Sequence, residues 1–224
     1  MELLDWITHA LQVLRSNLCW MGWNLLLAWI PLGLAIALFQ TRFSWQTQSP
    51  LQRGVWLLGV ALFVAFLPNA PYILTDTLHL IETWGWERSH STVVLVILPQ
   101  YVLFLLAGFA AYAVSLVLLS KFLQNQGWGQ WSQPIQFMLH GLSAVGVYLG
   151  RFERFNSWDL ATRPRQVLVR GLHDLVMGRS LLVIVTTFLV ITVLFWITAP
   201  LVERLLTSPT SAAPCESPPQ SLGR

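Results

Sequence analysis

The sequence predicts an all-α fold: a polytopic transmembrane helical bundle of about five spans with amphipathic surface helices. Hydrophobic residues make up 55% of the 224 residues and charged residues only 10%, whereas a soluble domain typically carries about 25% charged residues. Five apolar runs follow one another, and about 20 apolar residues are what a helix needs to cross a bilayer. Twelve Trp and twelve Phe add to the apolar surface. These features predict one membrane domain and identify no activity.

The first expected element is an amphipathic helix over residues 1–17 that lies on the membrane surface. Leu4, Ile7 and Leu11 recur every three or four residues, with Asp5 on the opposite side. The acidic start of the chain and the long apolar run that follows do not match a cleaved signal peptide.

The first two expected spans lie at 18–39 and 54–74. The first is about 33 Å long as a helix, enough for the roughly 30 Å hydrocarbon core. The second meets Pro68 and Pro71 before its end. Membrane helices tolerate proline where neighbouring groups satisfy the freed carbonyl. We therefore expect a span that breaks or kinks near its end, with a re-entrant segment as the alternative.

The third run, 93–119, is longer than one span needs, which predicts a tilted helix or an end that projects from the bilayer. Pro99 and the glutamine after it are its only interruption. The fifth run, 181–202, is strongly apolar. The last residues, 207–224, are rich in Pro and Ser and predict a flexible tail, so the membrane domain covers residues 18–206.

The fourth run, 134–150, is short and only weakly apolar. It contains polar side chains, among them His140 with Gln136 one turn before it. Gly146 and Gly150 stand four residues apart, which lets a neighbouring helix approach closely. An ionisable group inside a span is a functional hypothesis by default. The ordinary alternative is a neutral histidine bonded to Gln136 or to a nearby serine.

The basic residues predict the orientation, because cytoplasmic loops carry an excess of Lys and Arg. With five spans, one side carries Arg15, Arg88 and six arginines between 151 and 179, eight in all, and the other side carries five basic residues. We therefore expect the N-terminus and the 151–180 loop in the cytoplasm.

A first polar cluster follows the second run. On a helix over residues 72–86, Asp76, His79 and Glu82 recur every third residue and share one face. Carboxylate and imidazole groups suit a divalent metal or an acid/base pair, which makes these three candidate metal ligands, although the motif is short. The ordinary alternative is a solvated face on an interfacial helix.

A second polar cluster, residues 148–159, ends the fourth run. Arg151 or Arg154 could pair with Asp76 or Glu82 across the fold, since an arginine fork holds a carboxylate or a lipid phosphate in a fixed geometry. The alternative is that both arginines are positive-inside anchors within an aromatic belt.

Both clusters face the same side of the bilayer if the third run crosses once between them. Their polar residues then form one candidate site at the cytoplasmic membrane face. It comprises Asn69, Tyr72, Asp76, His79, Glu82, Arg151, Glu153, Arg154, Asn156 and Asp159.

A basic amphipathic segment, from Arg165 to Arg179, follows the second cluster. Its arginines alternate with apolar residues, a pattern that suits anionic lipid headgroups better than a nucleic-acid groove. We expect the lipid bilayer and anionic headgroups as partners, and no nucleic acid.

Both clusters also carry a resemblance. The matching stretches are Leu67-Pro68-Asn69-Ala70-Pro71-Tyr72-Ile73 with Thr75, Asp76 and His79-Leu80, and Tyr148-Leu149-Gly150-Arg151-Phe152 with Arg154 and Asn156-Ser157-Trp158-Asp159. They resemble a signature of the bacterial membrane family catalogued as domain of unknown function 1361, over roughly residues 18–200. The resemblance implies a small multi-pass protein of the cell inner (plasma) membrane. It brings no activity, substrate or catalytic residue.

Three classes of function fit these observations. The first is a non-catalytic membrane factor that binds a lipid, a membrane-protein partner or a second copy of the chain. The second is a membrane-embedded enzyme, metal-dependent or not, that acts on a lipid or headgroup. The third is a small-molecule transporter, which would need polar groups along several spans. No GxSxG, HExxH, P-loop or dinucleotide motif is present, so no cofactor is assigned.

Overall fold

The computed structural model describes residues 3–41, 48–87, 89–153, 155, 159–167, 169–170 and 178–207. Every regular element in these residues is helical, and no strand occurs among them. The expected all-α class is therefore confirmed. The expected tail, 207–224, lies outside the described residues except for its first residue.

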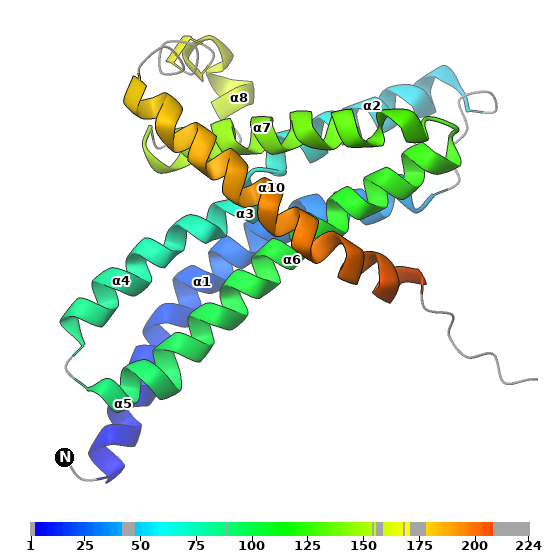
Figure 1. Ribbon diagram of the computed structural model, residues 1–224. Coiled ribbons are helices and arrows are strands. Elements are labelled where there is room, and N and C mark those ends of the chain that lie inside the picture. The colour runs from blue at the N-terminus through cyan, green and yellow to red at the C-terminus, as the bar shows by residue number, and fades with distance from the viewer. Residues whose placement is uncertain are drawn as a thin grey trace, which may run out of the picture.

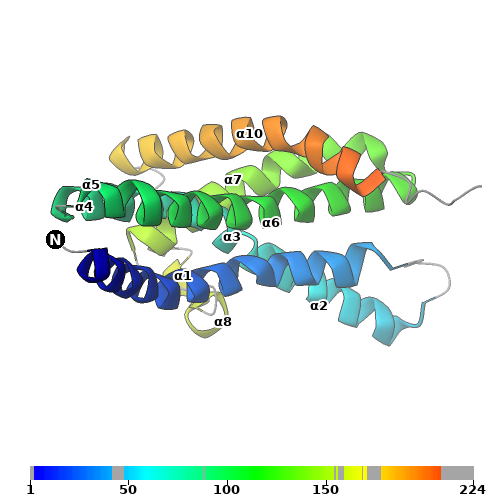
Figure 2. The ribbon, with the colours of Figure 1, turned by 90° about the horizontal axis from the view of Figure 1, so that it is seen from below.

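Helix α1 packs along α6 and α2, and α10 packs against α7 (Figures 1 and 2). In Figure 1, α10 crosses over α6 and α7. In chain order the elements are α1 (Leu3–Phe39), α2 (Pro50–Phe66), α3 (Asn69–Tyr72), η1 (Ile73–Asp76), α4 (Thr77–Trp86), α5 (His90–Thr92), η2 (Val93–Ile97), α6 (Leu98–Asn125), η3 (Gly129–Trp131), α7 (Ser132–Arg151), α8 (Asp159–Thr162) and α10 (Gly178–Thr207).

Helix α1 is continuous, so the segment expected as a surface helix, 1–17, runs on directly into the expected first span, 18–39. No Gly or Pro occurs between Leu3 and Met21 to break the helix. Side-chain contacts also hold this half of α1 against η2 and α6. The Asn17 amide donates to Gln100 Oε1 at 3.2 Å, and the Gln100 amide donates to the Leu14 carbonyl at 3.3 Å.

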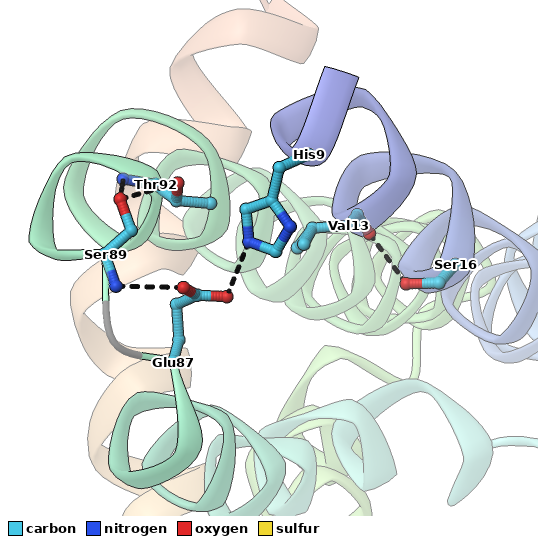
Figure 3. A network of polar contacts seen from close by, with 6 residues as sticks. All are labelled: His9, Val13, Ser16, Glu87, Ser89 and Thr92. Carbon is cyan, nitrogen blue, oxygen red and sulfur yellow. Dashed lines mark hydrogen bonds and ion pairs between the residues drawn. The ribbon is translucent and has the colours of Figure 1, made fainter. Parts of the chain in front are cut away.

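The first turns of α1 are tied to the connection between α4 and α5 (Figure 3). His9 Nε2 lies 3.1 Å from a carboxylate oxygen of Glu87. The other oxygen of Glu87 accepts a hydrogen bond from the backbone N–H of Ser89 at 2.9 Å. The Ser89 hydroxyl in turn caps α5 by accepting from the N–H of Thr92. This polar network fixes where the chain turns from α4 into α5.

Replacing His9 by alanine is expected to lower the free energy of unfolding by no more than about 1 kcal/mol, because a partly exposed pair contributes little. The His9 side chain is 41% exposed. The local effect is larger: amide hydrogen exchange at Ser89 and Thr92 should become faster than in the parent protein. His90→Ala, at an exposed position of α5, is the matched control. Equal exchange in the two variants would contradict this role for His9.

The second apolar run is broken, as the sequence predicts. Helix α2 starts with a capping box, in which Ser49 and Gln52 bond each other's backbone N–H groups, and ends at Phe66. Pro68 and Pro71 lack the N–H groups that would continue its hydrogen-bond ladder. The chain passes instead through α3 and the 3₁₀ turn η1 before α4 begins. The colours in Figures 1 and 2 show α2 and α4 in succession along the bundle, antiparallel to α1.

The third run begins with a π-helical turn, which the sequence did not predict. The turn η2 lies directly before Pro99, which occupies the first turn of α6. Proline is tolerated in a first turn because its missing N–H would have no partner there. Helical structure therefore continues from His90 to Asn125.

In the part of the chain that the structure describes, four helical stretches are long and apolar enough to cross a membrane, by length and composition. They are Leu3–Phe39, Pro50–Gly85, His90–Asn125 and Ser180–Thr207. The expected fourth span, 134–150, is helical as α7 but does not belong to these four. The five-span topology therefore stays a prediction.

Glycines let α3 and η1 enter the bundle between α6 and α7. A Cβ atom at Gly146 would lie 2.6 Å from the Pro68 ring, and one at Gly150 would lie 3.3 Å from the Tyr72 ring. Gly108 of α6 faces Ile73 in the same way. The predicted close packing of Gly146 and Gly150 thus takes place within the chain, and it places the end of α7 beside the broken helix.

Candidate functional site

A buried polar cluster lies where the broken helix meets α7. Asp76, the last residue of η1, is 1% exposed. Arg151, the last residue of α7, has its Nη1 atom 3.5 Å from Asp76 Oδ1. The side-chain amide of Asn24, in α1, donates to Asp76 Oδ2 at 3.2 Å. Three helical segments far apart in sequence therefore meet at one carboxylate.

The structure thus brings together the two polar clusters that the sequence places at one side of the bilayer. Of the pairings left open by the sequence, it contains the one between Arg151 and Asp76. A carboxylate removed from water needs an opposite charge and hydrogen bonds to offset a desolvation cost of several kcal/mol. Arg151 supplies the charge and Asn24 a hydrogen bond. Asn24 was not included in the candidate site that the sequence predicts. A single amide side chain within the first apolar run was a signal that could have indicated it.

The remaining residues of the candidate site are distributed differently. The exposed imidazole of His79 packs against Trp20, with ring centroids 5.7 Å apart. Glu153 pairs with Arg170 at 2.9 Å. Asp159 begins α8 and accepts from the Thr162 hydroxyl at 3.5 Å. The Glu82 side chain, Arg154 and Asn156 lie outside the described residues.

The helix expected over residues 72–86 is interrupted, and this changes the direction in which the Asp76 side chain points. Residues 73–76 form the 3₁₀ turn η1, and α4 begins only at Thr77. A 3₁₀ turn advances by about 120° per residue instead of about 100°. Asp76 accordingly points into the protein, whereas His79 is exposed.

A cavity of about 680 Å³ opens beside the buried cluster, between α1, α2–α3 and α7. Its polar groups come from Asn24, Asn69 and Tyr72, at the end where α7 finishes. The remaining length is apolar and includes Leu27, Ala61, Val64, Leu142 and Val145. The cavity is therefore amphipathic, with one polar end.

A family model described as "Protein of unknown function (DUF1361)" matches residues 23–193. The chain belongs to this family. The match includes Asn24, Asp76 and Arg151, so the whole buried cluster lies in the DUF1361 region. No curated protein and no solved structure gives a significant match.

Two apolar residues from the segment after α7 also line the cavity in this DUF1361 chain, and basic residues lie near them in sequence. Phe155 and the buried Val167 line it. Arg163 and Arg165, within one turn of Val167, are exposed. The guanidinium of Arg170 lies 6.0 Å from the centre of the Phe155 ring. Of the predicted basic segment, residues 171–177 lie outside the described part of the chain.

No cluster of three His, Cys, Asp or Glu residues that could hold a metal ion is found within the described ranges. Asp76, one of the three candidate ligands, uses its two carboxylate oxygens for Arg151 and Asn24. What this DUF1361 site offers is a guanidinium held in a fixed position, amide and phenol groups, and an apolar cavity.

Proposed function

We propose that this DUF1361 chain is a multi-pass membrane protein that binds an anionic phospholipid in the cavity between α1, α2–α3 and α7. The acyl chain would lie along the apolar part and the phosphate would lie at the polar end. The observation that carries the proposal is a partly exposed arginine, Arg151, that directly follows Gly150 of the cavity lining. It pairs with the carboxylate to which Asn24 of the same lining donates a hydrogen bond.

Arg151 has the chemistry that phosphate recognition requires. A guanidinium carries five N–H donors, and planar pairs of donors match a phosphate. One guanidinium nitrogen of Arg151 faces Asp76, and the Arg151 side chain is 20% exposed. Asp76 acts as a positioning residue, because its fixed carboxylate holds the guanidinium beside the cavity.

The charges around the cavity support an anionic headgroup. Arg163 and Arg165 are exposed beside Val167, which lines the cavity. Each basic residue near an anionic membrane surface contributes about 1 kcal/mol of attraction. A headgroup held beside Val167 would therefore have Arg163 and Arg165 within one helical turn of that residue.

The proposed topology has five crossings of the cell inner membrane, with the N-terminus and the 151–180 loop in the cytoplasm. The alternating directions of α1, α2–α4, α6, α7 and α10 support five crossings (Figure 2). The excess of arginines between 151 and 179 supports the orientation. Reporter fusions after residue 88 and after residue 165 should agree in location, and opposite locations would contradict the topology.

Blocking the cavity should abolish lipid retention without touching the ion pair. Ala61 lines the cavity, so Ala61→Trp is expected to weaken binding of phosphatidylglycerol by about tenfold or more, through steric exclusion. Leu58→Trp, on the same helix at an exposed position that does not line the cavity, is the control. Native mass spectrometry of the detergent-purified protein measures both.

The role of the guanidinium is tested by Arg151→Lys, which keeps the charge and removes the planar fork. Phosphatidylglycerol binding should weaken roughly threefold to tenfold while the fold is kept. Lipid recovered after incubation should be chemically unchanged. Conversion of the lipid would favour the enzyme class, and equal retention by Ala61→Trp and Leu58→Trp would reject the cavity as the site.

A further inference from the structure

A second cavity, of about 780 Å³, lies between α6, α7 and α10. The last turns of α6 and α10 and the first turns of α7 line it, including Gln124, Gln136 and Glu203. The phospholipid cavity lies at the other end of α7, beside Arg151. The two cavities share no lining residue.

His140 lines this second cavity and is 1% exposed. Its Nδ1 atom is hydrogen-bonded to the Tyr112 hydroxyl at 2.8 Å, and that hydroxyl also lies 3.4 Å from Ser143 Oγ. Its Nε2 atom is buried without a hydrogen-bond partner among the described residues. Leaving a buried polar atom unsatisfied costs about 1–3 kcal/mol, so such an atom at a cavity points to an additional partner.

The charge and ring content of the cavity define the partner. Glu203 is the one charged residue among the described lining residues, and no Lys or Arg is among them. Phe137 and Trp196 stand edge to face with ring centroids 5.9 Å apart, and Phe195 packs on His140 at 4.9 Å. Aromatic faces and a carboxylate attract cations, and serine and glutamine oxygens accept hydrogen bonds.

We infer that this second cavity binds an organic ammonium group. Glu203 balances the charge at the mouth, Trp196 and Phe137 supply ring faces, and neutral His140 accepts a hydrogen bond through Nε2 from the ligand. A divalent metal fits less well, because one carboxylate and one distant imidazole do not make a coordination shell. The ammonium group can come from a lipid headgroup or from a free amine. The site does not depend on the phospholipid proposed above.

Choline and its uncharged isostere 3,3-dimethylbutan-1-ol test the inference by isothermal titration calorimetry on the purified full chain. Choline should bind saturably and at least about tenfold more tightly than the isostere, because only choline gains from the carboxylate and ring faces. Equal affinities, or no binding of choline in any membrane mimic, would overturn the inference.

Variants with matched controls assign the binding to this cavity. Trp196→Leu should weaken choline binding roughly twofold to thirtyfold, and Glu203→Gln roughly twofold to fivefold. Trp84→Leu and Asp5→Asn make similar changes at exposed positions of α4 and α1 and should have no effect. Unchanged binding in both cavity variants would overturn the assignment. Ala61→Trp should leave choline binding intact, which separates this site from the phospholipid cavity.

Changing the lipid composition of the membrane distinguishes a lipid headgroup from a free amine as the source of the ammonium group. In nanodiscs of phosphatidylethanolamine, a headgroup ligand would compete and lower the apparent choline affinity relative to nanodiscs of phosphatidylglycerol. Equal choline affinity in both would assign the site to a free amine. Both results support ammonium recognition, since each requires saturable binding of choline.

Discussion

Replacing Arg151 by methionine is expected to lower the free energy of unfolding by about 3–5 kcal/mol, since removing one partner of a buried pair leaves the other charge uncompensated. The charge left behind is Asp76, which is 1% exposed and keeps the Asn24 hydrogen bond and an electrostatic interaction with His79 that is weaker than the one with Arg151. Methionine preserves most of the apolar length of the side chain, so the loss comes from the charge. Urea unfolding of the protein in detergent measures the difference.

The opposite substitution should be milder. Asp76→Asn leaves Arg151 without its ion pair, but the Arg151 side chain is 20% exposed and can reach water. The double variant Asp76→Leu, Arg151→Met should recover much of the stability, because apolar replacement of a buried pair is often close to neutral. The exposed pair of Arg170 and Glu153 is the control, and Arg170→Met should cost no more than about 1 kcal/mol.

These comparisons make the prediction easy to contradict. If Arg151→Met and Arg170→Met destabilise the protein equally, the pair with Asp76 is not the buried contact described above. If the double variant is no more stable than Arg151→Met, the loss reflects packing of the arginine stem and not an orphaned charge.

Replacing Gly146 by alanine is expected to destabilise the protein by about 1–3 kcal/mol through overpacking. The new Cβ atom would lie 2.6 Å from Cβ and Cγ of Pro68. The Pro68 ring cannot rotate away, so α3 must shift relative to α7. Because α3 leads directly into η1, the shift should also disturb the contact between Asp76 and Arg151 and reduce phosphatidylglycerol binding.

Gly141→Ala is the matched control on the same helix. No heavy atom lies within 4 Å of a Cβ at Gly141. Alanine is favoured over glycine in a helix interior by about 0.5–1 kcal/mol, so this variant should be slightly more stable than the parent. Thermal unfolding should therefore shift in opposite directions for the two substitutions. Equal shifts would show that α3 does not pack closely on α7.

Several features of the fold follow from local sequence. Apolar runs of membrane-spanning length predict the long helices, and Pro68 and Pro71 predict the break in the second of them. The spacing of Gly146 and Gly150 predicts close packing at the end of α7. At the start of α1 an amphipathic pattern indicated a surface helix, and the structure joins that segment to the first apolar run in one helix. A pattern of exposed and buried faces does not report helix ends, and no Gly or Pro ends the helix there.

The candidate site was predicted only in part, because its contacts join distant segments. Asn24, Asp76 and Arg151 meet across separations of 52 residues and more. Local pattern placed two polar clusters at one side of a membrane, but it left open whether Arg151 or Arg154 pairs with Asp76 or Glu82. It also counted Glu153 and His79 among the site residues. The structure pairs Glu153 with Arg170 and turns His79 outward.

The sequence by itself determined the helical class, the positions of the apolar runs, the broken second run and the location of the polar residues near two helix ends. These features depend on amino-acid composition, on the spacing of apolar residues and on the positions of proline, all of which influence structure over only a few residues. The tertiary structure alone decided which carboxylate is buried, that Asn24 donates a hydrogen bond to it, and that two cavities with no shared lining residue lie at the two ends of α7. Those outcomes depend on how helices pack against one another, since burial and pairing arise only when distant segments exclude water together.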